Sequence, residues 1–90
     1  MNQIWKYTFH PDTKSFDIPK GANIISVDNQ HENICMWAEV DTDQPEETRY
    51  FEVIGTGHNY PAGFVTLEYI GSVQLSGGSL IFHIYENHDN

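Results

Sequence analysis

Several features are scarce in this 90-residue chain, and each scarcity excludes a class of protein. Only four residues are lysine or arginine against 13 carboxylates, so the formal net charge is −9 and a nucleic-acid backbone should repel the chain. The single cysteine, Cys35, excludes an internal disulfide and fits a reducing compartment. No apolar run approaches the ~18–20 residues of a membrane span, and no secretion signal is recognisable at the start. We therefore expect a cytoplasmic protein that binds neither DNA, RNA nor membranes.

Motifs for catalysis and metal binding are also missing. The five histidines are scattered, and no pair has the HxH, HxxxH or CxxC spacing of a metal site. There is no G-x-S-x-G nucleophile elbow, and the position of Cys35 within an apolar run is typical of a packed thiol. Most neighbouring carboxylates lie in the polar segment 41–47, where solvent should leave them unperturbed. We therefore expect no enzyme, no metal and no cofactor.

The residues that are present predict β-strands almost throughout. Short runs rich in β-branched and aromatic residues alternate with turn residues, and no window keeps an apolar period of 3.6 residues. The apolar fraction of 39% is enough for one small core in a single domain, residues 1–90. We expect an all-β antiparallel sandwich or small barrel of about seven strands, with a polar, frayed tail at 87–90. The expected strands cover residues 4–9, 14–18, 23–27, 34–40, 48–54, 66–75 and 80–86.

Local patterns add detail to this prediction. The even-numbered residues of the run 34–40 are apolar and should share one face, with Trp37 on the other face. Residues 28–33 read as a polar connection, Gly71 predicts a bulge, and residues 76–79 (SGGS) predict a hairpin turn. The last strand is apolar on both faces, which suits a central strand or a contact with a second copy. We therefore expect a homo-oligomer.

A segment that reads FEVIGTGHNYPAG raises the question of an anion-binding loop. The backbone N–H groups of Gly55, Thr56, Gly57 and His58 could form a nest that holds an anion. The dinucleotide fingerprint fails because Tyr60 occupies its last glycine position, and the lysine of a P-loop is missing. A tight turn between strands is the ordinary explanation for the glycines.

Further side chains are candidates for ligand contact. Arg49 is the only arginine, and its planar fork suits a phosphate or a carboxylate, although it could equally answer a carboxylate of the protein. Trp37 and Tyr60 could form a stacking shelf, with core or interface packing as the ordinary alternative. His83, on the last expected strand, completes the candidate ligand-binding set.

Five stretches of the sequence are specific enough to compare with known families. They read IWK near the start, GANIISV at 21–27, MWAEVD at 36–41, ETRYFEVIGTGH at 47–58 and YIGSVQLSGGSLIFHIYE at 69–86. Together they resemble a family of small phage-encoded proteins that carry an uncharacterised domain. The segments 28–33 and 59–65 depart from the family pattern, so the resemblance implies nothing about them.

The resemblance suggests a function by analogy. Some small phage proteins sequester nucleotide signals of host immunity, and this chain is similar to them in size and in lacking a catalytic motif. We therefore expect a phage anti-defence protein of the host cytoplasm that binds a small nucleotide-derived signal, cyclic or ADP-ribose-like, without catalysis. The alternative is an acidic inhibitor that binds a host protein directly. A third hypothesis is an accessory protein of the virion or of its assembly. The first requires a concave, partly cationic pocket.

Overall fold

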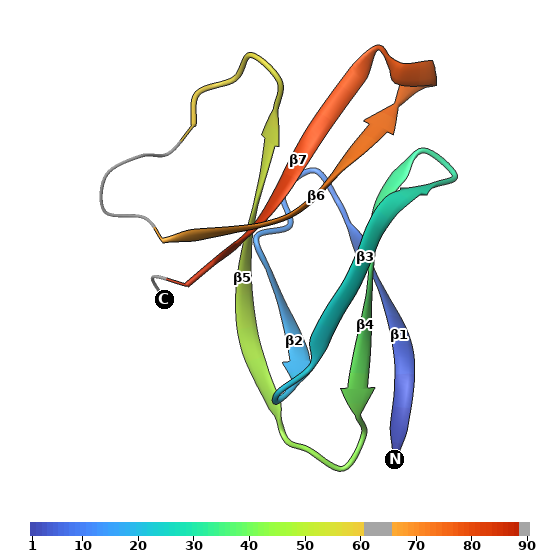
Figure 1. Cartoon of the computed structure of the whole chain (residues 1–90), viewed down its shortest axis with the longest axis vertical. Coiled ribbons are helices and arrows are strands. Elements are labelled where there is room, and N and C mark those ends of the chain that lie inside the picture. The colour runs from blue at the N-terminus through green and yellow to red at the C-terminus, as the bar shows by residue number, and fades with distance from the viewer. Residues whose placement is uncertain (61–65, 89–90) are drawn as a thin grey trace.

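The structure, a computed structural model, describes residues 1–60 and 66–88 and consists of two antiparallel sheets packed face to face (Figure 1). One sheet has the strand order β1-β4-β3, and the other has the order β2-β5-β7-β6. This confirms the all-β prediction and selects the sandwich over the closed barrel. The strands are β1 (Asn2–Phe9), β2 (Ser15–Pro19), β3 (Asn23–Gln30), β4 (Asn33–Asp41), β5 (Glu46–Gly55), β6 (Leu67–Leu75) and β7 (Leu80–Asn87), with a short 3-10 turn, η1 (Ser76–Gly78), before β7.

The core lies between the two sheets and follows directly from strand alternation. The even-numbered residues of β4 face it, as predicted, and Met36 and Ala38 are fully buried. Phe51 from β5 and Ile84 from β7 meet them from the opposite sheet. Three phenylalanine rings, from β1, β2 and β5, pack at steep angles to one another with centroids 4.9 to 5.9 Å apart. β7 lies between β5 and β6 in its sheet, which is one of the two positions that its apolar residues suggested.

The sheets also meet along one side, where β3 runs beside β6. Gly71 of β6 lies so close to β3 that an added Cβ would sit 2.6 Å from Val27 Cγ2. The ladder between β6 and β7 shifts register between Tyr69 and Gly71, which confirms the predicted bulge. A glycine is needed at this seam because a side chain would push the two edge strands apart.

Two hairpin connections contain residues with a left-handed backbone, and each includes a residue other than glycine, such as Ser76 with φ of 52°. In the predicted SGGS turn, Gly77 and Gly78 have φ of 65° and 96°, values that glycine adopts readily. The predicted polar connection at 28–33 is wrong in extent, because β3 continues to Gln30 and only two residues, His31 and Glu32, form the turn. Both have positive φ, 55° and 63°, as a type I′ hairpin requires.

The predicted frayed tail is wrong for its first two residues. Asn87 is the last residue of β7, and the His88 N–H donates to the Thr66 carbonyl at 2.9 Å. Residues 89–90 lie outside the described part of the chain, as do residues 61–65 of the segment after the GTGH motif. Within the described residues, no helix has the length and apolar character needed to cross a membrane.

Candidate functional site

The GTGH motif forms a tight turn whose N–H groups bond within the protein. The Thr56 N–H donates to the Ile81 carbonyl at 3.0 Å, and the His58 N–H donates to the Gly55 carbonyl at 3.0 Å. Gly57 has φ of 87°, which favours glycine. An added Cβ on Gly55 would sit 2.7 Å from the His58 ring. The glycines are therefore explained by the turn itself, and two N–H groups expected to hold an anion are already used.

Thr56 also begins a chain of hydrogen bonds on the β2-β5-β7-β6 sheet. Its hydroxyl oxygen lies 2.8 Å from His83 Nε2, and His83 Nδ1 lies 2.8 Å from the Ser72 hydroxyl oxygen. The Ser72 hydroxyl in turn lies 2.6 Å from the Tyr69 hydroxyl. These contacts fix the imidazole through hydroxyl groups, whereas a general base of the triad type is oriented by a carboxylate. The structure therefore brings together two predicted residues, Thr56 and His83, in one hydrogen-bonded chain of side chains.

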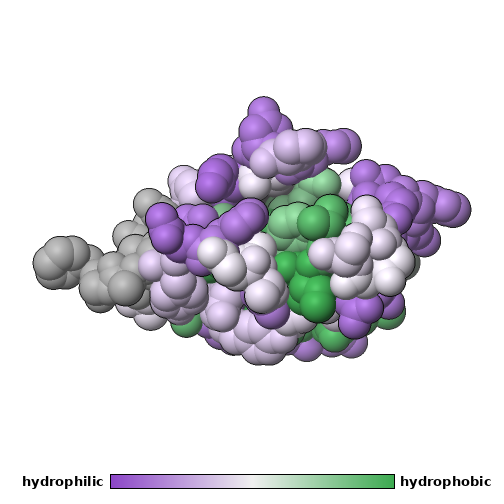
Figure 2. All heavy atoms as spheres, turned by 90° about the horizontal axis from the view of Figure 1, so that it is seen from above, coloured by the Kyte–Doolittle hydropathy of each residue, from purple (hydrophilic) through white to green (hydrophobic). Residues whose placement is uncertain are grey.

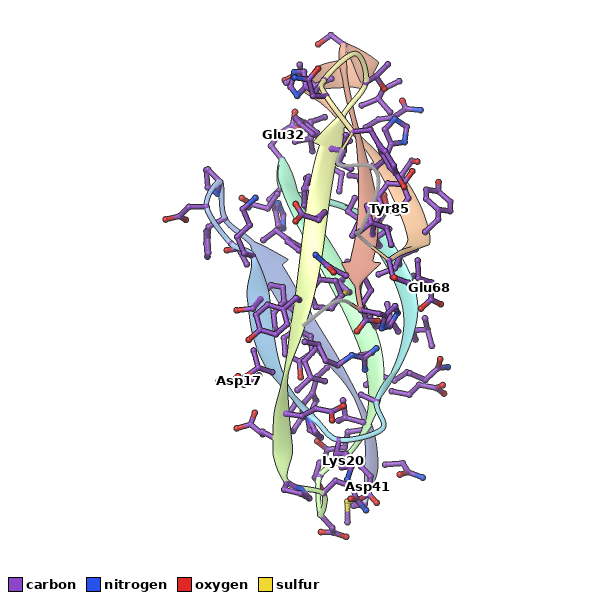
Figure 3. The ribbon with its side chains drawn as sticks, turned by 90° about the vertical axis from the view of Figure 1, so that its left-hand side faces the viewer. Asp17, Lys20, Glu32, Asp41, Glu68 and Tyr85 are labelled. Atoms are coloured by element: carbon purple, nitrogen blue, oxygen red, sulfur yellow. The ribbon has the colours of Figure 1, made fainter. Side chains whose placement is uncertain are left out.

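Tyrosine rings lie beside this hydrogen-bonded chain. Tyr60 packs edge to face on Tyr85 at a centroid distance of 5.6 Å, and Tyr69 meets the same ring at 5.5 Å. Tyr60 and Tyr69 are both largely exposed, and Tyr85 is labelled in Figure 3. The predicted stacking residue Tyr60 is thus connected to His83 through Tyr85, Tyr69 and Ser72. A cavity of ≈ 260 Å³ lies at the GTGH turn and is lined by Gly55, Thr56, His58 and residues 79–82.

Arg49 lies elsewhere and holds a carboxylate of the protein itself. Its Nε and Nη2 donate to the two carboxylate oxygens of Glu86 at 2.6 and 2.7 Å, and its Nη1 donates to the Ala22 carbonyl at 2.6 Å. The side chains are only 18% and 7% exposed. The hydrogen bonds that Arg49 donates to Glu86 raise the pKa of Arg49 above its ordinary value, against the opposing effect of burial. The Arg49 guanidinium, which we expected to bind a ligand, therefore binds the Glu86 carboxylate.

A group of possible metal ligands surrounds this ion pair. Among the described residues, Glu68, Glu86 and His88 bring one ligand atom each within 4.8 Å of one another, and Glu68 is labelled in Figure 3. His88 Nε2 lies 2.8 Å from Glu68 Oε1. Carboxylate and imidazole together suit ions such as Zn²⁺. However, Arg49 already neutralises Glu86, and its positive charge opposes a cation at that carboxylate. The three side chains therefore offer donor atoms for a metal ion, but the positive charge of Arg49 disfavours a cation beside Glu86.

Trp37 lies on the opposite sheet from these residues. It is half-buried on the outer face of the β1-β4-β3 sheet, where it lines a shallow depression of ≈ 570 Å³ with Ile4, Ile25 and residues 26–30. Lys6 crosses the same face, and its Nζ donates to Gln30 Oε1 at 2.6 Å. The predicted ligand-binding residues therefore occupy three separate places: the GTGH turn with its neighbouring tyrosines, the Arg49–Glu86 pair, and the outer face at Trp37.

A further cavity, the end cavity, lies where the two sheets open at one end of the sandwich. It has a volume of ≈ 370 Å³, and Figure 2, which looks onto this end, shows apolar atoms at its centre with hydrophilic atoms around them. This volume and an apolar lining with a few polar groups are typical of small-molecule sites, which span about 300–1,000 Å³. Five strands contribute apolar side chains to the walls of the cavity, and polar side chains surround its opening as a rim. The wall residues are Phe9, Ile34, Val53, Leu75 and Phe82. The rim residues are His10, Thr13, Lys14, Glu32 and Asn33, with Pro11 beside them.

The rim of the end cavity combines a braced carboxylate with an exposed cation. Glu32 Oε1 accepts the Ser76 N–H at 2.9 Å, and Glu32 Oε2 accepts the Asn29 side-chain amide at 2.9 Å. These bonds tie the β3–β4 hairpin to the β6–β7 hairpin. Lys14 is largely exposed, with its Nζ 3.6 Å from a Glu52 carboxylate oxygen, so it makes only a weak surface ion pair. Lys14 is therefore available to a ligand that reaches the rim.

The sequence did not predict the end cavity, because its lining comes from strand ends spread over the whole chain.

No curated protein and no solved structure shows significant similarity to the chain. A family described as a domain of unknown function, DUF7352, matches residues 1–90. This agrees with the uncharacterised domain that the sequence resembles. Because the match spans the full 90 residues, the chain belongs to the DUF7352 family.

Proposed function

We propose that this domain is a non-catalytic binding protein that holds the ring of a small ligand in the end cavity. The observation that carries the proposal is the convergence of five apolar side chains, from five different strands, on one opening of ≈ 370 Å³. Polar groups are confined to the rim of that opening. An apolar interior provides affinity for a flat ring, and the rim groups orient the rest of the ligand.

The nucleotide-derived immune signal suggested by the resemblance is the ligand class to test first. A base would enter the end cavity, and a phosphate would lie at the rim near Lys14 and His10 rather than at Arg49. A ligand of roughly 35 heavy atoms at about 0.3 kcal/mol per atom reaches about −10 kcal/mol, a Kd of tens of nanomolar. That affinity is enough for a phage anti-defence protein to remove a signal from the host cytoplasm by sequestration alone.

The charges at the rim of the end cavity restrict which nucleotide-derived ligands fit there. The chain carries a net charge of −9, and the rim places Glu32 close to the same opening as Lys14. The two side chains oppose one another in their effect on an anion. The rim therefore suits a ligand that brings a single phosphate charge to the rim better than one that brings a diphosphate there.

The acidic inhibitor remains a second candidate because carboxylates are exposed at the other end of the molecule. The connection between β4 and β5 carries Asp43, which is largely exposed, and Figure 3 shows Asp41 at the end opposite Glu32. The amino-terminal ammonium lies 3.0 Å from Asp41 and 2.8 Å from Asp43. Part of this acidic surface is therefore neutralised by the chain itself, which weakens the case for a strongly basic partner.

A binding experiment separates the two candidates. The purified protein is incubated with cyclic mononucleotides, cyclic dinucleotides and ADP-ribose derivatives, recovered by filtration and denatured, and released ligand is identified by mass spectrometry. For a ligand captured in this way, Lys14→Ala should weaken binding about tenfold, the effect of one charge-assisted contact. Lys20→Ala is the matched control, because Lys20 is exposed outside the end cavity. Failure to capture any of these compounds would count against the nucleotide class.

Chemical-shift mapping locates the site independently of ligand identity. Amide resonances of Phe9, Asn33 and Phe82 should shift on ligand addition, while those of Asp43 and Glu47 should not. Shifts confined to the acidic connection, produced by a host protein rather than a small molecule, would favour the inhibitor. Shifts around Thr56 and His83 would instead move the site to the tyrosine-bearing face.

A further inference from the structure

Among residues 1–60 and 66–88, the sandwich has four edge strands, and they are not equally protected. β3 and β6 run beside each other along the Gly71 seam. β2 has only five residues, carries Asp17 and ends in Pro19. β1 differs from all of these: it has eight residues, it pairs with β4 without a register shift, and it forms an outer edge in Figure 1. A long, regular, uncovered edge is a template for another strand.

Charge makes a second copy of the chain the occupant that fits this edge. The chain has 13 carboxylates, yet β1, with the sequence NQIWKYTF, has none. Its only charged side chain, Lys6, is directed across the sheet to Gln30 on β3, away from the open edge. Two copies with a net charge of −9 each repel over most orientations. Contact through β1 brings no carboxylate of either strand against another.

The hydrogen-bond alternation of β1 shows which residues offer free backbone groups. The Thr42 N–H donates to the Met1 carbonyl at 2.9 Å, in register with the ladder that pairs Asn2 with Asp41. In an antiparallel ladder, bonded pairs alternate with non-bonded pairs, so the odd-numbered residues of β1 bond to β4. The even-numbered residues, among them Ile4, therefore direct their N–H and C=O groups to the open edge.

We propose that β1 pairs antiparallel with β1 of a second copy about a two-fold axis at Trp5. The pairing joins two three-stranded sheets into one of six strands and is isologous, as most dimer interfaces are. In this register Ile4 faces Lys6 of the partner subunit, and all of β1 is paired. A two-fold axis at Lys6 would place two ammonium groups opposite each other, which is destabilising. The pairing also covers Ile4, which is 60% exposed in a single chain.

The dimer has a consequence for the end cavity. With the two-fold axis at Trp5, Phe9 of one chain pairs with Met1 of the partner subunit. Phe9 lines the end cavity, so the partner's Met1 lies beside the rim. Ligand binding and dimerisation are therefore coupled if the proposed function holds, whereas the strand pairing itself does not depend on any ligand.

Analytical ultracentrifugation of the full chain over a range of concentrations tests the pairing. The expected result is a species of twice the 10.3 kDa chain mass. Ile4→Pro should raise the dimer dissociation constant at least tenfold, because it removes an N–H that faces the open edge and spares the bonds to β4. The matched control is Ile25→Ser, which removes an exposed apolar side chain, 46% exposed, from β3 of the same sheet. Far-UV circular dichroism verifies that both variants fold.

Two results would overturn the proposal. A chain that stays monomeric at about 1 mM associates by less than about 4 kcal/mol, too little for a functional dimer. A dimer as strong in Ile4→Pro as in the parent chain would place the interface elsewhere. The register is tested by Trp5→Cys, which should form an intermolecular disulfide at the two-fold axis, whereas Gln3→Cys should not. Cys35 is buried and does not interfere.

Discussion

Replacing Arg49 with methionine should lower the free energy of unfolding by about 3 kcal/mol at neutral pH. The substitution keeps an apolar stem of similar length but removes the two N–H donors that lie 2.6 and 2.7 Å from the Glu86 carboxylate. Breaking a buried pair by removing one partner costs about 3–5 kcal/mol, because a buried charge is left uncompensated. We take the lower end because the Arg49 site retains some contact with water. A domain of this size has a total stability of only about 5–13 kcal/mol.

The reciprocal changes test whether the cost comes from the orphaned charge. Arg49→Met combined with Glu86→Leu should recover most of the loss, because replacing a buried pair with apolar residues is often neutral. The control is Lys14→Met, because Lys14 is largely exposed and its 3.6 Å ion pair with Glu52 should contribute less than about 1 kcal/mol. If the double variant is less stable than Arg49→Met alone, the desolvation argument is wrong.

Urea unfolding followed by tryptophan fluorescence provides the measurement, since Trp5 and Trp37 report on the β1-β4-β3 sheet. The slope of free energy against urea should be the same for all variants, so that shifts in the midpoint report stability. A loss below 1 kcal/mol for Arg49→Met would refute the assignment of Arg49 to the fold. The same folded variant should bind the ligand proposed for the end cavity with unchanged affinity.

The remaining predictions concern the seam and the amino terminus. Gly71→Ala should cost about 1–3 kcal/mol through overpacking against Val27, and Val27→Ala should restore stability in the double variant, as measured by thermal unfolding. The N–H of Asp43 and the terminal amine lower the pKa of Asp41, while Asp43 and Asp41 raise the pKa of the terminal amine. The stabilisation from Asp41 is therefore lost as pH falls through its pKa, which lies below the ordinary carboxyl value of 3.8. The stabilisation from the terminal amine is lost as pH rises through its pKa, which lies above the ordinary value of 8.0. Amino-terminal acetylation should remove the alkaline loss in denaturation curves recorded against pH.

The strands could be predicted from sequence because alternation is a local signal. Each expected run from 4–9 to 80–86 overlaps a strand of the structure, and the bulge at Gly71 and the glycine turn follow from single residues. The turn at His31 and Glu32 could not be found in this way. The polar residues of 28–30 look like a loop, but they continue β3 where the strand faces solvent.

The candidate site was harder to predict because contacts between distant strands decide it. Arg49 has Glu47 and Glu52 as sequence neighbours, yet its partner is Glu86, 37 residues away. A usable signal was present in β7, where alternation places Glu86 on the same face as Ile84. A carboxylate on an apolar face requires a buried counter-charge, and the only arginine is the natural choice. The end cavity offered no comparable signal, since each of its wall residues looks like ordinary core.

Glu32 connects the conformation of one turn to the rigidity of the end cavity. Its left-handed φ costs roughly 1–2 kcal/mol for a residue other than glycine, and the same side chain joins the tips of two hairpins through Ser76. Glu32→Gly would relieve the first effect and abolish the second, so the hairpin would form more easily while the rim loosened. Position 32 therefore lets the stability of the hairpin and the residence time of the proposed ligand evolve in opposite directions, with the apolar walls left unchanged.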